Sequence, residues 1–321
     1  MPINSINTVK NEPEISIIIP AFNESKFITQ TLTSVANSEF SRERFEIIVV
    51  DNGSTDCTLS LAERFADVTA ILPDVNVGAV RNYGVKLSSG QLLIFIDADC
   101  VVESTWLRQA HKLAIESRDT IFGGICKAPK QANWIERFWL LDSENRKQRD
   151  LTGACIVVSR NNFDLAGGFN ENITSGEDTN FSEKLRSLGK SVEICPDFYV
   201  THLGNADTLK RFISRQAWHG ENYFYNIKSS LRDPTFILCV FAFIIAVLTI
   251  TLPVILKLNT FYLLLILLII PAIFSAKRIL YSRYFTLNPV SLLKIYILDG
   301  SYVIGRCLGI LKSSLPRANK H

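Results

Sequence analysis

Two aspartates separated by one residue are the strongest candidates for chemistry in this chain. Asp97 and Asp99 directly follow LLIFI at 92–96, an aliphatic segment typical of a strand buried on both faces. Two carboxylates this close repel each other, and a divalent cation is the usual remedy. Oxygen ligands favour Mg²⁺ or Mn²⁺ over zinc. Because protein-bound magnesium commonly also contacts substrate phosphates, the pattern predicts a nucleotide diphosphate as the other ligand.

Three further polar clusters follow apolar segments upstream of these aspartates. ISIII at 15–19 runs into Pro20-Ala21-Phe22-Asn23-Glu24, and EIIVV at 46–50 into Asp51-Asn52-Gly53-Ser54-Thr55-Asp56; VTAIL at 68–72 leads to Asn76-Val77-Gly78 and Arg81-Asn82-Tyr83-Gly84. One such cluster is explained by turn and helix-cap chemistry. Four clusters at the ends of successive segments indicate a ligand site.

The elements that position these clusters alternate between strand and helix patterns. Helical patterns at 24–37, 55–65 and 78–88 separate the four apolar segments. This alternation predicts an α/β fold with a parallel sheet and right-handed crossovers. Ligands of such sheets bind beyond the carboxyl ends of the strands. The chain has no Walker A motif, and no Gly-x-Gly-x-x-Gly follows the first strand, which weakens the P-loop and dinucleotide interpretations.

Composition narrows the class of protein further. The 321 residues are 47% hydrophobic with a net charge of +3, which excludes an extended disordered chain and does not indicate nucleic acid as a partner. The seven cysteines are dispersed and form no CxxC pair, so neither a zinc site nor a disulfide framework is expected, and a reducing compartment is favoured. Residues 1–14 contain no apolar core of a secretory signal peptide.

Two long uncharged segments lie near the C-terminus. Residues 236–256 would form a helix of about 30 Å, the thickness of a hydrocarbon core, and 258–276 follow after Lys257. We expect an antiparallel transmembrane hairpin; the alternative is a helical hairpin buried in a soluble core. Basic residues outside both ends predict that the N-terminal domain faces the cytoplasm. They are Lys228, Arg232, Lys277, Arg278 and Arg283.

The predicted domain organisation has four parts. An N-terminal segment at 1–13 precedes a globular domain at 14–231, a transmembrane hairpin at 232–276 and an amphipathic tail at 277–321. The tail is interpreted as a helix on the membrane surface, with a third span interrupted by Asp299 as the alternative.

Five motifs resemble those of the family 2 glycosyltransferases of the GT-A fold. They are IIIPAFNES, VVDNGSTD, NVGAVRNYG, FIDADC and SGEDTNFSEKLRSLG, and the resemblance covers roughly residues 13 to 220. It implies a Rossmann-like, mostly parallel sheet flanked by helices. The membrane hairpin also resembles bacterial members that build surface polysaccharides or glycolipids, which implies the cytoplasmic (inner) membrane as the location.

The resemblance also implies roles for individual residues. Asp178 matches the general base, Asp51 the carboxylate that recognises the base, usually uracil, and Arg81 a position near the diphosphate. Asp97, Asp99 and, more loosely, His202 match the metal ligands. Glu177 and Arg215 are candidate acceptor or diphosphate contacts. The other nucleotide-sugar contacts implied are Pro20, Ala21, Phe22, Glu24, Gly53 and Ala98.

Simpler interpretations of some of these residues stay open. Glu177 and Asp178 begin a helical pattern, where acidic side chains are favoured by the helix dipole and serve as caps. His202 is equally compatible with a structural histidine. Arg215-Gln216-Ala217-Trp218-His219 only approximates the Gln-x-x-Arg-Trp signature of processive synthases, which weakens the expectation of processive synthesis.

The expected function is therefore an inverting, membrane-anchored transfer of a sugar. The donor is a nucleotide sugar, with UDP expected, the cofactor is Mn²⁺ or Mg²⁺, and the acceptor is a saccharide or a lipid-linked saccharide. One alternative is a polyprenyl-phosphate glycosyltransferase, whose acceptor is the lipid phosphate itself. Another is a catalytically silent nucleotide-sugar-binding scaffold of a polysaccharide assembly complex.

Overall fold

The computed structural model describes residues 12–117, 119–140, 148–221, 223, 227–257, 259–282 and 288–314. The predicted N-terminal segment 1–13 lies outside these residues except for its last two. The described chain forms two compact units. The first contains 12–126, 148–171 and 177–204, and the second contains 127–140, 172–176 and the described residues from 205 onward. The single domain predicted for 14–231 stays a prediction.

The first unit is built around an eight-stranded sheet with the order β3-β2-β1-β4-β7-β6-β8-β5. Its first four strands are parallel. Central β1 pairs with β2 and β4 so that Ile17 lies beside Ile47 and Ile94. These strands coincide with the four predicted apolar segments: β1 Ile15–Ala21, β2 Phe45–Asp51, β3 Val68–Ile71 and β4 Leu92–Phe95.

The other half of the sheet contains antiparallel pairs, which the alternation pattern did not indicate. β7 pairs antiparallel with β4 and with β6, and β5 pairs antiparallel with β8, placing Cys100 opposite His202. The complete sheet is therefore mixed, although the half formed by β1 to β4 is parallel as expected. The remaining strands are β5 Cys100–Val101, β6 Thr120–Lys127, β7 Ile156–Ser159 and β8 Ser191–His202.

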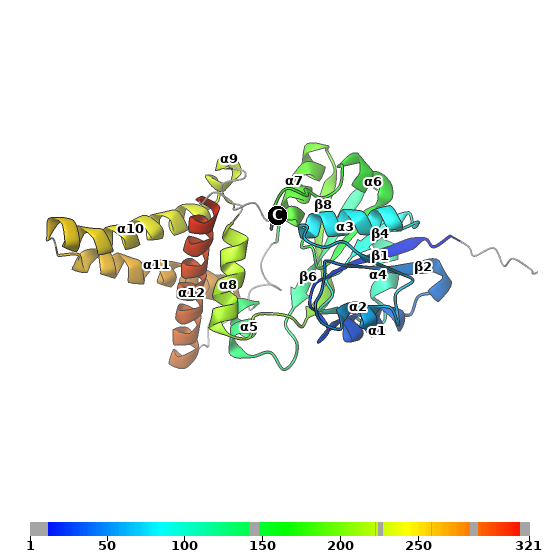
Figure 1. Cartoon of the computed structure of the whole chain (residues 1–321), viewed down its shortest axis with the longest axis horizontal. Helices are drawn as coiled ribbons and strands as arrows, with labels where there is room; N and C mark the ends of the chain where they lie inside the picture. The colour runs from blue at the N-terminus through cyan, green and yellow to red at the C-terminus, as the bar shows by residue number, and fades with distance from the viewer. Residues whose placement is uncertain are drawn as a thin grey trace, which may run out of the picture. The chain divides into compact units, whose positions relative to one another are not determined.

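Helices cover both faces of this sheet (Figure 1). Alternate residues of β1 point to opposite faces, so Ile17 packs with α1 and α4 whereas Ile18 packs with α3, α6 and α7. Each face therefore has its own apolar core. The elements are α1 Ile28–Ala36, η1 Arg42–Arg44, α2 Thr58–Ala62, α3 Val77–Leu87, α4 Trp106–Glu116, α6 Arg160–Leu165 and α7 Glu177–Ser187.

The second unit consists of helices. Its bounds are α5 Trp134–Trp139, α8 Leu209–Gly220, α9 Ile227–Ser230, α10 Pro234–Leu256, α11 Phe261–Ser282 and α12 Pro289–Ser314. α10 begins with Asp233, whose side chain accepts a hydrogen bond from the Thr235 amide at 2.9 Å. It ends at Lys257, which has a left-handed backbone conformation. Both features are common boundaries of helices.

The predicted hairpin is formed by α10 and α11, which lie side by side and extend away from α8 and α12 (Figure 1). Residues 234–255 and 261–280 are long and apolar enough to cross a membrane, and only 17% of each apolar segment is buried. This exposure is contrary to the alternative of a hairpin buried in a soluble core. The described residues of the predicted tail contain the end of α11 as far as Ser282 and the long helix α12.

Candidate active site

The loops that follow β1 and β2 are joined by hydrogen bonds at the carboxyl edge of the sheet. The Asn23 amide donates to Ser54 Oγ at 2.8 Å, and Asn23 Oδ1 accepts from the Thr55 amide at 2.9 Å. The Glu24 amide donates to Thr58 Oγ1 at 2.8 Å. Four residues of the first loop are predicted to contact the nucleotide sugar. Of these, Phe22 is exposed, Pro20 and Glu24 are half-buried, and Ala21 is buried.

Asp51 is buried at the end of β2, and its carboxylate organises the loop that follows. It accepts hydrogen bonds from the Gly53 amide at 3.1 Å, from the Ser54 amide at 2.8 Å and from the Ser54 hydroxyl. Gly53 has φ +80°, a conformation that other residues adopt at a cost. Asp51 and Gly53 are both predicted to contact the nucleotide sugar, and the Asp51 carboxylate therefore holds this loop in one shape.

Arg81 connects two acidic segments that are far apart in the sequence. It projects from α3, is 2% exposed, and donates to Asp97 Oδ1 at 2.8 Å and to the Glu177 carboxylate. Burial opposes its charge, but the charges of Glu177, Asp97 and Asp178 outweigh burial and raise the pKa of Arg81. The guanidinium thus holds the Asp97 loop beside the start of α7.

Asp178 is held in an environment that favours its protonated form. Loss of hydration is the main cause, and the negative charge of Glu177 adds to it; together they raise the pKa of Asp178 to about 7. Asp178 Oδ2 accepts a hydrogen bond from the Gly153 amide at 3.0 Å. Because a base works best with a pKa near the working pH, this carboxylate is suited to accepting a proton.

Asp99 lies beside His202, because β5 and β8 pair at this point. Asp99 Oδ1 is 3.6 Å from His202 Nε2, and both side chains are nearly buried. The two residues and Cys100 form a group of potential metal ligands whose atoms lie within 4.8 Å of one another. Asp97 is not in this group, since its carboxylate pairs with Arg81.

The donor chemistry of this group fits a divalent metal ion, because carboxylate, imidazole and thiolate are all metal ligands. Burial, followed by the charges of Asp99 and Asp97, raises the pKa of the Cys100 thiol. Gly204 leaves the required space, because a Cβ atom there would lie 1.9 Å from Asp99 Oδ2.

Sequence analysis missed two glycines that shape this site. A Cβ atom at Gly153 would lie 2.4 Å from Arg81 Nη2, and Gly204 borders Asp99 in the same way. Neither glycine stands in a recognised motif, and the clash partner is distant in the sequence in both cases. Arg215 belongs to the second unit, so its predicted contact with diphosphate or acceptor stays a prediction.

The chain is similar in sequence to known glycosyltransferases. Residues 16–171 match the family described as Glycosyl transferase family 2. Glycosyltransferase AglE of Haloferax volcanii is 27% identical over 203 residues, which are 59% of this chain and 67% of AglE. The poly(ribitol-phosphate) beta-N-acetylglucosaminyltransferase TarS of Staphylococcus aureus is 32% identical over 103 residues. These residues are 30% of this chain and only 18% of TarS.

A solved structure shares the fold over nearly the whole chain. The mannosyltransferase PcManGT from Pyrobaculum calidifontis, solved in complex with GDP-Man and Mn²⁺, superposes with a TM-score of 0.62 at 16% identity. The match covers 95% of this chain and 89% of PcManGT. The fold and the family match thus define a GT-A enzyme that transfers glycosyl groups. Residues 16–171 form its family 2 glycosyltransferase domain.

Proposed function

We propose that this glycosyltransferase moves a sugar from a nucleotide diphosphate donor to a saccharide or lipid-linked acceptor with inversion at the anomeric carbon. The observation that carries the proposal is the position of Arg81. It joins Asp97, in the predicted metal motif, to Glu177, which directly precedes the carboxylate with the raised pKa. The Arg81 guanidinium, which is suited to binding phosphate, and the Asp178 carboxylate, which is suited to act as the base, therefore lie in one cluster.

The proposed reaction is a single displacement. The acceptor hydroxyl attacks the anomeric carbon as the bond to the donor diphosphate breaks, and Asp178 takes the hydroxyl proton. Inversion follows from one attack on the face opposite the leaving group. Arg81 suits the diphosphate because a guanidinium makes bidentate contacts with phosphate, and it stabilises the negative charge that develops there.

A divalent cation is proposed to bind at Asp99 and His202, with Asp97 on the adjoining loop. Support comes from the ligand distances and from the space that Gly204 leaves beside Asp99. PcManGT was solved with Mn²⁺. When bound, such an ion neutralises charge on a leaving diphosphate. Asp97 also pairs with Arg81, so we expect it to position the guanidinium as well as the donor.

The donor is proposed to occupy the loops after β1 and β2. The contacts would be made by Pro20, Ala21, Phe22, Glu24, Asp51, Gly53 and Ala98, and a UDP-sugar is the expected donor. PcManGT was solved with GDP-Man, so the nucleotide is a matter for experiment. Glu177 and Arg215 remain candidates for acceptor or diphosphate contacts.

Membrane anchoring is the second part of the proposal. The exposed apolar surface and the length of α10 and α11 support a transmembrane hairpin. Arg232 precedes α10, and Lys277 lies near the end of α11; both support a catalytic unit facing the cytoplasm at the inner membrane. A short hairpin brings the enzyme to lipid-linked acceptors, and a polyprenyl phosphate is the alternative acceptor that this location also suits.

A donor screen tests the catalytic proposal. UDP-, GDP- and dTDP-sugars are incubated with the purified full-length protein and Mn²⁺, and released nucleotide is measured. With the preferred donor, Asp178→Asn should lower the rate by about 10²–10⁴, as expected on removal of a general base. Asp99→Asn should lower it strongly as well, whereas the exposed control Glu63→Gln should not.

The outcome separates the proposed enzyme from a silent scaffold. Equal turnover in the wild type, Asp178→Asn and Asp99→Asn would remove both catalytic assignments. Donor binding in a calorimeter without turnover under any acceptor condition would favour the scaffold interpretation. Turnover only with a polyprenyl phosphate as acceptor would support the alternative acceptor.

A further inference from the structure

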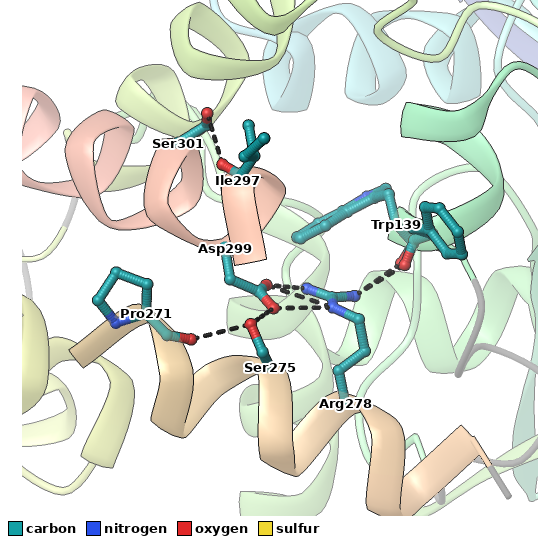
Figure 2. Close-up of polar contacts among 8 residues, drawn as sticks. Trp139, Pro271, Ser275, Arg278, Ile297, Asp299 and Ser301 are labelled. Atoms are coloured by element: carbon teal, nitrogen blue, oxygen red, sulfur yellow. Dashed lines mark hydrogen bonds and ion pairs between the residues drawn. The ribbon is translucent and has the colours of Figure 1, made fainter. Parts of the chain in front are cut away.

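A buried ion pair joins α11 to α12 in the second unit. Asp299, in the middle of α12, is fully buried, and Arg278 lies near the end of α11. Arg278 Nη2 is 2.7 Å from Asp299 Oδ1. Asp299 Oδ2 accepts a hydrogen bond from the Ser275 hydroxyl at 2.9 Å (Figure 2).

The same guanidinium also binds the end of α5. Arg278 Nη1 donates to the carbonyl oxygens of Phe138 and Trp139, each at 3.2 Å, and Figure 2 shows the contact with Trp139. These carbonyls end a helix and need a donor. The pair is thus fully hydrogen-bonded, which is the condition under which a buried charge pair holds one arrangement of its helices.

The position of the pair along the hairpin is informative. Arg278 follows Phe261 by 17 positions, a rise of about 26 Å along α11. This length is close to the hydrocarbon thickness of about 30 Å. If Phe261 lies at one boundary of the hydrocarbon, Arg278 lies near the other. α12 therefore crosses the hairpin at the level where the hairpin leaves the lipid.

One face of α12 carries large exposed apolar side chains. They recur at intervals of three, four or seven positions, which places them on one side of a helix. Each is at least 40% exposed. We call this set the apolar stripe; it consists of Val290, Leu293, Ile297, Ile304, Leu308 and Leu311.

The hairpin leaves α12 on the same side as the apolar stripe. Near the end of α11, Arg278 contacts α12 at Asp299. Nearer the start of α11, Pro271 lies beside Gly300 of α12, where a Cβ atom would lie 3.8 Å from Pro271 Cγ. At about 100° per residue, Gly300 lies about 50° from the centre of the stripe and Asp299 about 150° from it. The stripe thus faces the direction in which the hairpin extends.

We propose that α12 lies on the membrane surface, with the apolar stripe in contact with lipid and the Arg278–Asp299 pair holding it across the base of the hairpin. α10 and α11, which pack against α12, also expose apolar side chains, which is why lipid is the partner. Lys294 and Lys312 lie along one edge of the stripe, where long cationic side chains can reach headgroups; in this structure Lys294 lies over the Trp134 ring and Lys312 pairs with Glu221. This inference rests on the membrane anchoring proposed above.

Fluorescence quenching by lipids tests the position of α12. An NBD label is attached to Ile304→Cys, Ile269→Cys or Glu63→Cys in a chain whose native cysteines have been replaced. The labelled full-length protein is reconstituted in phosphatidylcholine–phosphatidylglycerol vesicles. These vesicles contain lipids that carry a nitroxide quencher either near the headgroup (shallow) or far along the acyl chain (deep). Each chain is first checked for glycosyl transfer; if the background is inactive, Cys100, Cys155 and Cys239 are restored, since they are buried.

We expect shallow quenchers to act most strongly at position 304, deep quenchers at 269, and neither at 63. Quenching at 269 without quenching at 304 would overturn the position of α12 while leaving the anchor intact. A second copy of the chain covering the stripe would give this same result. Equally deep quenching at both sites would mean that α12 spans the membrane, which also overturns the inference. No quenching at 269 would remove the membrane anchor itself.

The same label tests the role of the ion pair. Asp299→Asn keeps the size of the side chain but leaves Arg278 without its charge partner, so the preference of position 304 for shallow quenchers should fall at least twofold. Ser301→Ala is the matched control, because the Ser301 hydroxyl donates to the Ile297 carbonyl oxygen of its own helix at 2.9 Å (Figure 2). An unchanged preference in Asp299→Asn, with activity retained, would overturn the role of the pair.

Discussion

Arg81 shows how one side chain determines the electrostatics of the active site. Its charge pairs with Asp97 and Glu177 and acts on Asp178. Two opposing influences therefore meet at Asp178, because burial and Glu177 raise its pKa whereas Arg81 lowers it. The balance leaves a carboxyl group that changes protonation near neutral pH.

The first prediction concerns the pH dependence of transfer. A carboxyl group with a pKa of about 7 is protonated below that pH and cannot accept the acceptor proton. The rate kcat should therefore fall about tenfold per pH unit below 7 and reach a plateau above it. In Glu177→Gln the acid limb should move to lower pH, because a negative charge that raises the pKa of Asp178 has been removed.

The measurement is kcat between pH 5 and 9 at saturating donor. The exposed variant Glu63→Gln serves as the control and should keep the wild-type profile. A profile in Glu177→Gln that moves to higher pH, or a wild-type rate independent of pH below 7, would contradict the assignment of Asp178 as the base.

The second prediction concerns the metal site. In Gly204→Ala the new Cβ atom would lie 1.9 Å from Asp99 Oδ2, so the carboxylate must move. We expect the Mn²⁺ concentration for half-maximal activity to rise at least tenfold. Gly300→Ala is the matched control, since its Cβ atom meets only ordinary contacts. Equal Mn²⁺ requirements in the two variants would argue against Asp99 as a ligand.

At the scale of elements, close approach between helices depends on glycine. α8 and α12 pack along much of their length, and Gly305 and Gly309 face α8. A Cβ atom at Gly309 would lie 2.3 Å from the Ala217 carbonyl oxygen and 2.7 Å from Gly220 Cα. Both are backbone atoms, so the helices must separate to accommodate a larger residue.

The third prediction follows from this contact. Gly309→Ala should destabilise the protein by about 1–3 kcal/mol, the usual cost of overpacking, although alanine favours helix formation. Thermal unfolding in detergent should show a lower midpoint than in the wild type. Gly300→Ala should show an equal or higher midpoint. If Gly309→Ala raises the midpoint instead, the close packing of α8 and α12 is not limiting.

The elements also show how far the sequence alone was sufficient. Continuous aliphatic segments marked β1 to β4 within one or two residues. Such segments are typical of strands buried on both faces, as β1, β2 and β4 are, whereas β3 is only partly buried. The antiparallel pairing of β7 with β4 and β6, and of β5 with β8, was not predicted, because it depends on long-range contacts. Similarly, Asp178 and Arg81 were identified from motifs, but the bond between Arg81 and Glu177 joins residues 96 positions apart.

At the scale of the whole molecule, a soluble catalytic fold is combined with exposed apolar helices. The superposition with PcManGT extends over 95% of the chain, so the fold similarity is not restricted to the residues that match the family. The exposed apolar surface of α10 and α11 is large for a protein in water. A lipid environment would remove this cost, so under the proposed anchoring the position of the hairpin determines where the enzyme acts.

The fourth prediction concerns the orientation of the hairpin in the membrane. Lys257 is the single charged residue between positions 236 and 276 and lies at the turn between α10 and α11. If the base of the hairpin is cytoplasmic, Lys257 must face the opposite side. In sealed right-side-out vesicles, a membrane-impermeant maleimide should label Lys257→Cys and leave Glu63→Cys unlabelled, with the exposed or half-buried Cys57, Cys126, Cys195 and Cys307 replaced by Ser in both. In inverted vesicles the pattern should reverse. Labelling of both positions from one side would mean that the hairpin does not cross the bilayer, because a span of about 30 Å must separate its two ends.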